Sequence, residues 1–457
     1  MQFVSPRYLL PTFIIVPPSA YHYPTQKVMD CGQGKNGVPI VVQHSEIKID
    51  IEDTQQKNQD KFQSKSDART IDDDCKIDRL FFRICYFCLM LGVNFYRNRC
   101  AWKCVLSIII VTVASTLNVY FIGYVAYLCL SQKFEAERVA TSISVGTWVL
   151  QATLSTLFLA FWQSTGQSCK LLRLLYEANK GEGVHHHRKS LVAIVRIFYV
   201  VLALTVCYYV VLIVANQVEY RVGYMDNEIP MIFGDRRLFI IAQLSILYCI
   251  LCWGVALFIF SLLIHATHYE FDYFNQQVRS ITCNYEYQTD ETLCDYLIKL
   301  MKVHNNLTEC VKRLDQMFNR YVFVMITTII PTSMFSLFNI VHKPDRPFSI
   351  PLFISFLLVI YCGFSFYTLV NAPSKLHNTI YNTKSALCAN THVWFPYRPN
   401  VYHSALAFVC HLDQTNLGVS IWGFAVVSKP LVLTTLSVMV TCLALFLQVG
   451  DCNVENR

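Results

Sequence analysis

The long hydrophobic runs of this chain almost lack charge. Six of its seven runs contain no Asp, Glu, Lys, Arg or His, and the third contains only Arg196, a few residues from its start. Carriers that couple transport to an ion place ionisable side chains inside the membrane, so this absence argues against coupled transport. The runs also lack the lysine that the Schiff base of a retinal protein requires, which excludes an opsin.

Catalytic and metal-binding motifs are missing as well. The chain has no nucleophile elbow, Walker loop or HExxH motif, and the Ser and Thr residues of the runs have no paired base. Cys85 and Cys88 have zinc-like spacing but no second pair near them, and His185–His187 have no adjacent acidic or cysteine partner. We therefore predict no enzymatic activity, no metal and no cofactor.

Apolar segments of membrane-crossing length are what the chain does have. Of its 457 residues 54% are hydrophobic and 15% are charged, which is unusual for a soluble protein. A helix needs about 20 apolar residues to cross the hydrocarbon core. Seven runs qualify, at 104–130, 139–163, 191–215, 238–264, 321–341, 348–370 and 431–449. We predict an all-α membrane protein with seven transmembrane helices.

The basic residues of the loops indicate the orientation. With the N-terminus inside, the cytoplasmic loops hold fifteen Lys and Arg and the outer loops hold seven. Lys and Arg are retained on the cytoplasmic side, so we predict a cytoplasmic N-terminus and an extracellular C-terminus. The net charge of +7 then faces anionic lipid rather than nucleic acid. Only Cys452 lies in an outer loop or tail, which predicts no structural disulfide.

Several segments outside the runs also have an expected structure. We predict that residues 1–79 form a flexible cytoplasmic tail and that residues 451–457 form a short extracellular tail. Residues 291–320 form an amphipathic stem that leads into the fifth run without Pro or Gly. A similar extension at 168–179 follows the second run, so we expect the stems to pack in a cytoplasmic bundle. Segment 404–428 is interpreted as a cytoplasmic helix or a re-entrant element. The apolar positions of the first stem are Leu293, Leu297, Leu300, Val303, Leu307, Val311 and Leu314.

The last run, 431–449, carries a stripe of small and polar residues. At about 100° per residue the stripe covers an arc of roughly 80° on one helix face. Copies of this helix around a symmetry axis would present uncharged polar rings to water, which suggests weak discrimination among cations. Packing of helix against helix is the alternative, and the stripe alone leaves both open. Its residues are Thr434, Ser437, Thr441, Ala444 and Gln448.

The same run resembles the last span of the arthropod and nematode gustatory receptors, relatives of the insect odorant receptors. The signature of that family is Thr-Tyr, five mostly apolar residues, then Gln-Phe. Thr441 and Gln448 match it across the intervening LALFL, while Cys442 replaces the Tyr and Val449 replaces the Phe. Seven spans, an inside N-terminus, the long stem and the segment LDQTNLGVSIWGFAVVSKPLVLTT extend the resemblance over roughly residues 80–450.

The resemblance implies a chemosensory, ligand-gated, non-selective cation channel built as a tetramer in the plasma membrane of sensory neurons. Residues 80–450 would form the channel domain, in a homotetramer or with other family members. Thr434, Ser437, Thr441 and Gln448 would line the pore, with Gln448 at the gate. The substitution at Val449 removes the usual aromatic plug. A small-molecule tastant and membrane lipids are the implied partners.

The resemblance also places the ligand pocket among the outer halves of the second to sixth spans. An aromatic lining with a few amides suits a small ligand that has apolar faces and some hydrogen-bonding groups. Packing against neighbouring helices or lipid is the alternative role of such aromatics. The residues in these halves are Trp148, Tyr208, Tyr209, Gln243, Tyr248, Phe335, Phe338, Asn339, Phe353 and Phe356.

Three alternatives remain open. A G-protein-coupled receptor would have its N-terminus outside, and no DRY-like or NPxxY-like motif is found where one is needed. A member of the same family could sense light or peroxide through a tryptophan such as Trp148 or Trp253. A structural membrane protein is the third.

Topology separates the channel from the G-protein-coupled receptor. We predict that an epitope at the N-terminus is accessible to antibody only after the cells are permeabilised, because the basic loops hold that terminus inside. Labelling of the epitope on intact cells would exclude the predicted orientation.

Overall fold

The computed structural model describes residues 101–131, 136–222, 239–281, 289–342, 350–413 and 417–455. All of them belong to one compact unit, Ile71–Arg457. The predicted cytoplasmic tail 1–79 lies outside the described residues, as do 456–457 at the end of the predicted outer tail.

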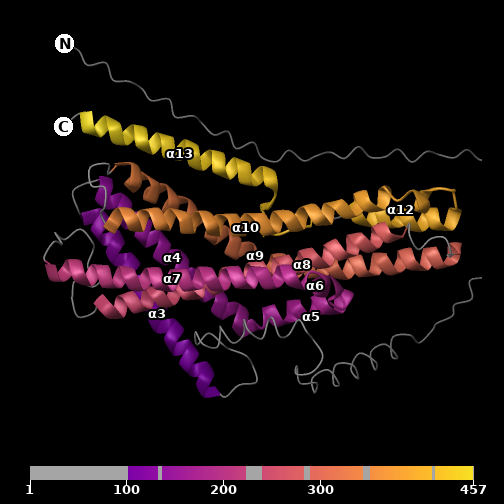
Figure 1. Cartoon of the computed structure of the whole chain (residues 1–457), viewed down its shortest axis with the longest axis horizontal. Coiled ribbons are helices and arrows are strands. Elements are labelled where there is room, and N and C mark those ends of the chain that lie inside the picture. Colours follow the sequence, from indigo (N-terminus) through magenta and orange to yellow (C-terminus); the bar gives the residue numbers. More distant parts are fainter. Residues whose placement is uncertain are drawn as a thin grey trace, which may run out of the picture. The chain divides into compact units, whose positions relative to one another are not determined.

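The described residues are helical except for loops and one short hairpin (Figure 1). The seven predicted runs fall in α3, α4, α7, α8, α9, α10 and α13. The helices are α3 (Ala101–Ser131), α4 (Ala136–Thr165), α5 (Gln167–Asn179), α6 (Glu182–His186), α7 (Arg188–Val222), α8 (Phe239–Ser280), α9 (Asp290–His342), α10 (Ile350–Cys388), α11 (Thr391–Trp394), α12 (Pro399–Asp413) and α13 (Lys429–Glu455). The antiparallel hairpin joins β1 (Ser420–Ile421) to β2 (Ala425–Val426).

Six of these helices are long and apolar enough to cross a membrane: α3, α4, α7, α8, α9 and α10. In α13 the apolar helical stretch found among the described residues, Lys429–Cys442, is shorter than a span. The prediction of an all-α membrane protein is confirmed. Seven crossings and the orientation of the termini stay predictions.

Three helices are much longer than a membrane is thick. α8, α9 and α10 have 42, 53 and 39 residues, and at about 1.5 Å per residue α9 alone is roughly 80 Å long. Their extensions pack together with α5 and α12 in what we call the stem bundle: α8 after residue 264, α9 before 321 and α10 after 370 (Figure 1). The predicted stem positions on α9 are buried except Val303, which is half-buried. The amphipathic stem is therefore confirmed.

The second predicted stem has a different form. Gly166 adopts a left-handed conformation, φ 64°, between α4 and α5, so the chain makes two helices rather than one continuous one. α5 still buries one face, with Leu171, Leu175 and Ala178, against the other helices of the stem bundle.

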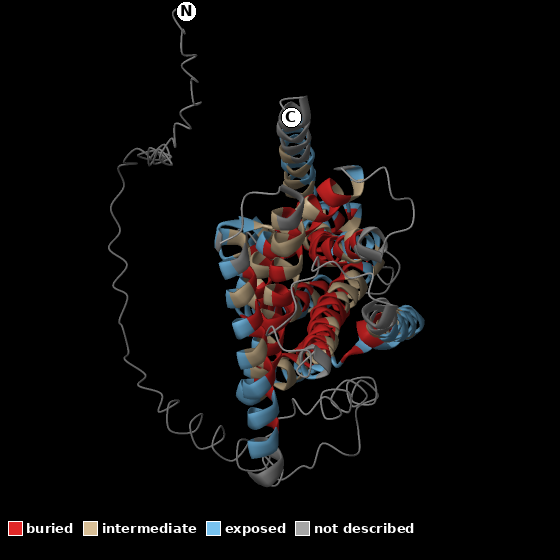
Figure 2. Cartoon of the chain, turned by 90° about the vertical axis from the view of Figure 1, so that its left-hand side faces the viewer, coloured by how far each residue is buried: buried red, intermediate tan, exposed pale blue. Residues whose placement is uncertain are grey.

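Antiparallel packing of α4 along α9 organises the interior. At one end the Ser144 and Ser336 hydroxyls lie 2.6 Å apart. At the other end the rings of Trp162 and Phe318 meet edge to face, with centroids 4.9 Å apart, and Tyr321 packs beside both. This aromatic cluster, which also contains Phe158 and Phe260, marks the junction of the membrane helices with the stem bundle (Figure 2 shows the buried interior).

A histidine without hydrogen bonds lies inside the stem bundle. His304 of α9 is completely buried, and neither of its ring nitrogens has a hydrogen-bond partner in the part of the chain that the structure describes. Its neighbours are Phe271 and Phe274 of α8 and Phe408 and His411 of α12, with ring centroids 5.5 to 6.0 Å away. Burial, and to a smaller extent His411, lower the pKa of His304 to about 4. The imidazole is therefore neutral in the folded protein.

We predict that acid destabilises the stem bundle through His304. An unfolded histidine has a pKa of about 6.5, so its contribution to stability is complete above that pH and is lost as pH falls toward the folded pKa of about 4. Between about pH 7.5 and about pH 5 the loss should be about 2 kcal/mol. Unfolding midpoints of the detergent-solubilised protein at the two pH values measure it.

The matched variants are His304→Phe, which should remove this part of the pH dependence, and His403→Phe on the exposed face of α12, which should not. An undiminished acid loss in the His304→Phe protein would contradict the prediction.

Candidate functional site

The first candidate site is the half of the membrane bundle in which α4 begins and α9 ends. We call it the outer half, because the predicted topology places it outside. Short polar side chains hold α4 against α9 in this half: Thr147 and Thr332 lie 2.8 Å apart through their hydroxyl oxygens, one helical turn from the Ser144–Ser336 pair. Thr332 also donates to the Thr328 carbonyl at 2.7 Å. The helices that would surround a ligand are thus fixed by uncharged hydrogen bonds.

Two of the aromatic and amide residues predicted for the pocket are joined to each other. The Tyr209 hydroxyl of α7 donates to the Gln243 side-chain carbonyl of α8 at 2.8 Å, and both side chains are buried. The contact ties α7 to α8 in the outer half. Tyr208, the neighbouring residue, is half-buried.

Two other predicted residues carry a buried polar atom without a hydrogen-bond partner among the described residues. These atoms are the indole Nε1 of Trp148 and the side-chain carbonyl oxygen of Asn339. The hydroxyl of Tyr248, a third predicted residue, lies beside the Cys252 thiol, which is a weak hydrogen-bond partner. Most buried polar atoms in proteins are hydrogen-bonded, and an unsatisfied one costs about 1–3 kcal/mol. A ligand or a water molecule that bonds to these atoms would recover that cost.

The prediction omitted two amides of the same kind. Gln151 of α4 is completely buried, its carbonyl oxygen has no partner among the described residues, and its amide nitrogen contacts the Met325 sulfur at 3.6 Å. The Asn118 side chain of α3 accepts from Ser245 at 3.3 Å, and its amide has only the Cys249 thiol, a weak partner, beside it in the described part of the chain. An amide within an apolar run was the available signal for both. They add hydrogen-bonding capacity where α3, α4, α8 and α9 pack together.

The remaining predicted pocket residues lie in different surroundings. Phe338 is buried and Phe335 is half-buried on α9, whereas Phe356 is 54% exposed on the surface of α10. The side chain of Phe353 lies outside the described residues.

The second candidate site is α13, which lies at the edge of the bundle and packs mainly against α9 (Figures 1 and 2). The predicted pore residues Thr434, Ser437, Thr441 and Gln448 are all exposed in the single chain. The apolar faces are uncovered too, with Leu433 69% and Val440 67% exposed. Such a surface requires lipid or further subunits around it.

The hydroxyls of the stripe are partly satisfied by their own helix. Thr434 donates to the Pro430 carbonyl at 3.0 Å, and Thr441 donates to the Ser437 carbonyl at 2.9 Å. Each hydroxyl oxygen keeps its acceptor lone pairs, which face away from the helix axis and can accept a hydrogen bond from water.

The hairpin before α13 is bound to α9. Asp315 of α9 accepts from the Ser420 backbone N–H at 2.6 Å and from the Ser420 hydroxyl at 2.7 Å. That hydroxyl in turn accepts from the Gly423 N–H at 3.1 Å, which closes the turn, and Gly423 has a positive φ of 79°. The entry to α13 is thereby held by one carboxylate of the stem.

A second contact strengthens this attachment. The backbone N–H of Trp422 donates to the backbone carbonyl of Asn319 at 3.2 Å. The Trp422 ring packs edge to face on Phe323, with ring centroids 4.7 Å apart. The interpretation of 404–428 as one helix or re-entrant element is correct only for its first part, which belongs to α12. The hairpin forms because α9 supplies partners for its backbone and side chains.

Comparison with known proteins gives a fold but no close relative. No family model matches this chain, and no curated protein does. The structure is similar to that of the insect olfactory receptor OR5 from Machilis hrabei, with a TM-score of 0.65 and 14% identity over 82% of this chain and 98% of the receptor. The same receptor in complex with eugenol gives 0.64 and 12% over 81% and 99%.

At these identities the likeness establishes the fold. The chain is a multi-pass helical membrane protein, and the proteins whose fold it shares are receptors rather than enzymes. The resemblance to this group of chemoreceptors is confirmed at the level of the fold: the chain has the fold of an insect olfactory receptor.

Proposed function

We propose that this chain is a subunit of a chemosensory, ligand-gated, non-selective cation channel of the gustatory receptor kind. The observation that carries the proposal is the uncovered polar stripe of α13, in a chain whose fold is that of an olfactory receptor along nearly the whole length of that receptor. A helix with one polar face cannot conduct alone, so conduction requires several copies around an axis. We infer four subunits, as the resemblance to the gustatory receptors implies.

In that assembly Thr434, Ser437, Thr441 and Gln448 face the central pore, and the apolar faces of α13 contact neighbouring subunits and lipid. The lining is uncharged, and hydroxyl and amide oxygens can replace water around any small cation. Weak selectivity follows. The side chain of Val449, which stands where the related signature has Phe, lies outside the described residues.

The ligand is a small molecule bound in the outer half. The olfactory receptor of similar fold binds eugenol, and the described part of this chain has unpartnered polar atoms on Trp148 and Asn339 among apolar side chains. Neutral donors and acceptors in an apolar surrounding favour an uncharged ligand with one or two hydrogen-bonding groups.

We propose that α9 connects the ligand site to the pore. α9 carries Asn339 in the outer half and Asp315 at the hairpin, and it is one continuous helix between them. A shift of α9 on ligand binding would therefore move the base of α13 through Asp315–Ser420. We further propose the plasma membrane of sensory neurons as the location, and assembly with itself or with related chains.

The pore assignment predicts that Gln448→Ala changes single-channel conductance and relative cation permeability, because the amide ring at the gate is lost. Currents from cells that express the protein, recorded with the agonist found in a chemical screen, measure both. Leu436→Ala, at an exposed position on another face of α13, is the matched control and should leave both unchanged. Wild-type conductance and permeability in Gln448→Ala would remove this residue from the pore.

The pocket assignment predicts that Asn339→Leu raises the agonist concentration for half-maximal current about fivefold to tenfold, because one hydrogen bond to the ligand is lost. Asn306→Leu, on the exposed face of the stem, makes the same exchange away from the pocket and should not shift it. The comparison is a dose–response curve for each variant. Equal agonist concentrations for half-maximal current in the two variants would contradict the assignment of Asn339 to the pocket.

A further inference from the structure

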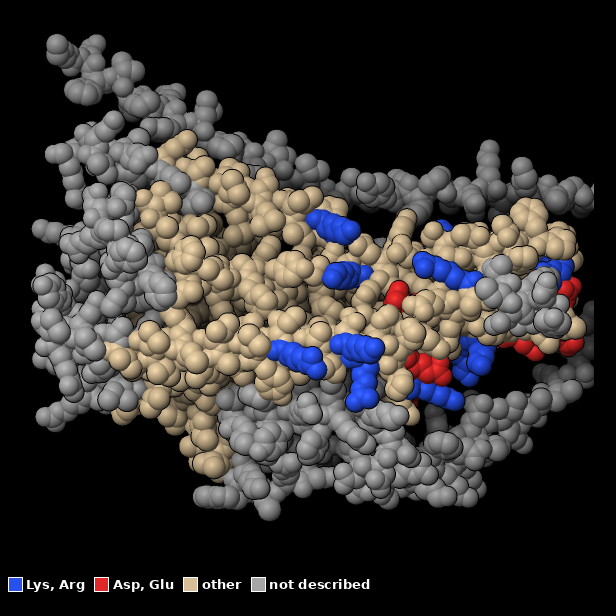
Figure 3. All heavy atoms as spheres, in the orientation of Figure 1, with Lys and Arg blue, Asp and Glu red and all other residues tan. Residues whose placement is uncertain are grey.

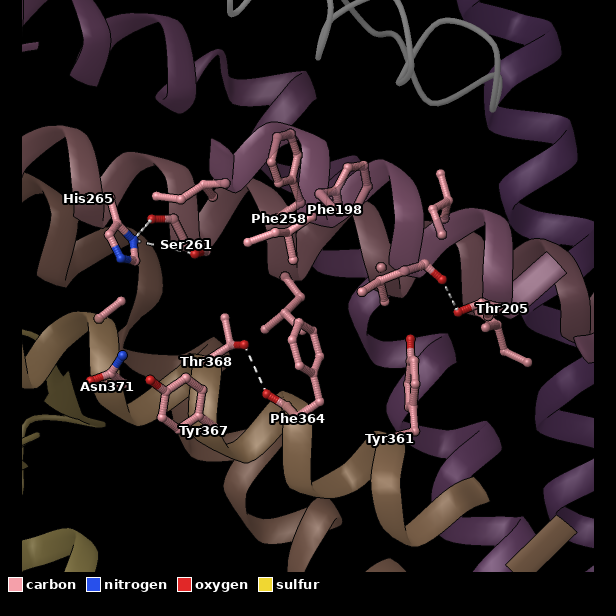
Figure 4. A pocket seen from close by; sticks show the side chains of 18 residues that line it. Phe198, Thr205, Phe258, Ser261, His265, Tyr361, Phe364, Tyr367, Thr368 and Asn371 are labelled. Atoms are coloured by element: carbon pink, nitrogen blue, oxygen red, sulfur yellow. Dashed lines mark hydrogen bonds between the residues drawn. The ribbon is translucent and has the colours of Figure 1, made fainter. Parts of the chain in front are cut away.

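A cavity of about 180 Å³ lies between α7, α8 and α10, and it contains none of the residues predicted for the ligand pocket. Its middle is aromatic: Phe198 of α7 and Phe258 of α8 stack with centroids 3.9 Å apart, and Phe364 of α10 lies opposite (Figure 4). Gly254 of α8 leaves part of the space open, since a Cβ there would meet only Leu202, at 3.6 Å.

The cavity can be reached from the side of the bundle. Ile197, Tyr367 and Phe364, which all line it, are 54%, 62% and 38% exposed. Among the six apolar helices α7 is the least covered by protein. In a membrane this surface faces lipid, so a molecule dissolved in the bilayer can enter without passing through water.

Polar groups gather at one end of the cavity. Figure 4 shows His265, Ser261 and Asn371 at this end, with Tyr367 beside Asn371, whereas Thr205 lies toward the other end. The His265 Nδ1 lies 2.8 Å from the Ser261 carbonyl oxygen, which can only accept, so Nδ1 carries the hydrogen. In the neutral ring Nε2 is then an acceptor, and the Asn371 amide offers both a donor and an acceptor.

This polar end lies where two apolar runs end, which is the depth expected for lipid headgroups. His265 directly follows the apolar run 238–264, and Asn371 directly follows the run 348–370. On the face drawn in Figure 3, Lys and Arg gather from the middle of the described part toward the stem bundle, and none is seen over the described residues of the membrane end. A lipid whose polar group lies at that boundary would place its chain among the phenylalanines.

Charge and size restrict the occupant. No Asp, Glu, Lys or Arg is among the described residues that line the cavity, so an ionised group inside it would lose its water without a charged side chain in contact. Lys375 interacts with His265 from outside this lining. A cavity of about 150 Å³ holds one benzene ring, so this volume suits a segment of one narrow chain, and the rest of the chain would lie along the exposed side of the cavity. We propose that the cavity binds an uncharged single-chain lipid alcohol from the membrane, whose hydroxyl donates to His265 Nε2 and accepts from Asn371.

Photolabelling tests this binding without any channel current. The full-length protein in phosphatidylcholine nanodiscs is irradiated with a long-chain alcohol that carries a diazirine in its chain, and labelled peptides are identified by mass spectrometry. We expect label on α7, α8 and α10 around the cavity, and competition by unlabelled monooleoylglycerol. Label distributed evenly over all membrane helices, or equal competition by oleate, would overturn the proposal.

Two variants locate the site. Gly254→Leu fills the cavity and should lower the labelling about tenfold, whereas Gly363→Leu, in open space on α10 and outside the lining, should not. Asn371→Leu removes one hydrogen bond at the polar end and should raise the competing concentration of monooleoylglycerol about fivefold to tenfold. Wild-type labelling in Gly254→Leu would overturn the cavity as the site. If that variant fails to fold, an unchanged competition curve in Asn371→Leu would do so.

Discussion

The continuity of α9 is the constraint on which the rest of the structure depends. Its 53 residues carry the serine and threonine pairs that hold α4, the aromatic cluster at the junction, the core of the stem bundle and the carboxylate that holds the hairpin. Pro331 lies inside this helix without ending it. In lipid an interrupted backbone would expose unpaired N–H and C=O groups, so a continuous helix is the favoured way to carry one chain through both environments.

The two ends of α9 use different physical chemistry. In the membrane half the contacts are hydroxyl pairs and methionine sulfur, which can be buried without charge. In the stem bundle the contacts are leucines on one face and, at Asp315, a side-chain carboxyl oxygen that accepts from a backbone N–H and a hydroxyl. Aromatic rings around Tyr321 separate the two regions. A rigid element with polar attachments at both ends can transmit a displacement, which is the basis of the proposed gating route.

The unpartnered groups divide into two kinds. His304 is surrounded by aromatic rings in the stem bundle, and it can be buried among them because its imidazole is neutral. Trp148, Gln151 and Asn339 lie among membrane helices, where an unsatisfied polar atom is costly unless something bonds to it. The membrane bundle thus has unsatisfied hydrogen-bonding atoms in its outer half. A separate cavity with partly exposed lining residues lies near its stem end. α13 differs from both, because its polar residues are uncovered rather than buried.

Much of the helical framework could be predicted from the sequence, because apolar length and three-to-four periodicity are local properties. The apolar runs, the leucine face of the α9 stem and the polar stripe of α13 all follow from residues close together in the chain. The hairpin, the break at Gly166, the Tyr209–Gln243 bond and the Asp315–Ser420 attachment could not be predicted in this way. They join residues far apart in the chain or depend on one backbone angle. The periodicity of apolar residues predicts neither long-range contacts nor single backbone angles.

By itself, then, the sequence determined that this is a helical membrane protein whose long apolar runs almost lack charge, with an amphipathic stem and one polar face on its last helix. Only the tertiary structure decided which polar atoms stay unpartnered, where the cavity lies and how the last helix is attached. The reason is that burial and hydrogen-bond satisfaction are set by which helix faces meet, and that depends on all the helices at once.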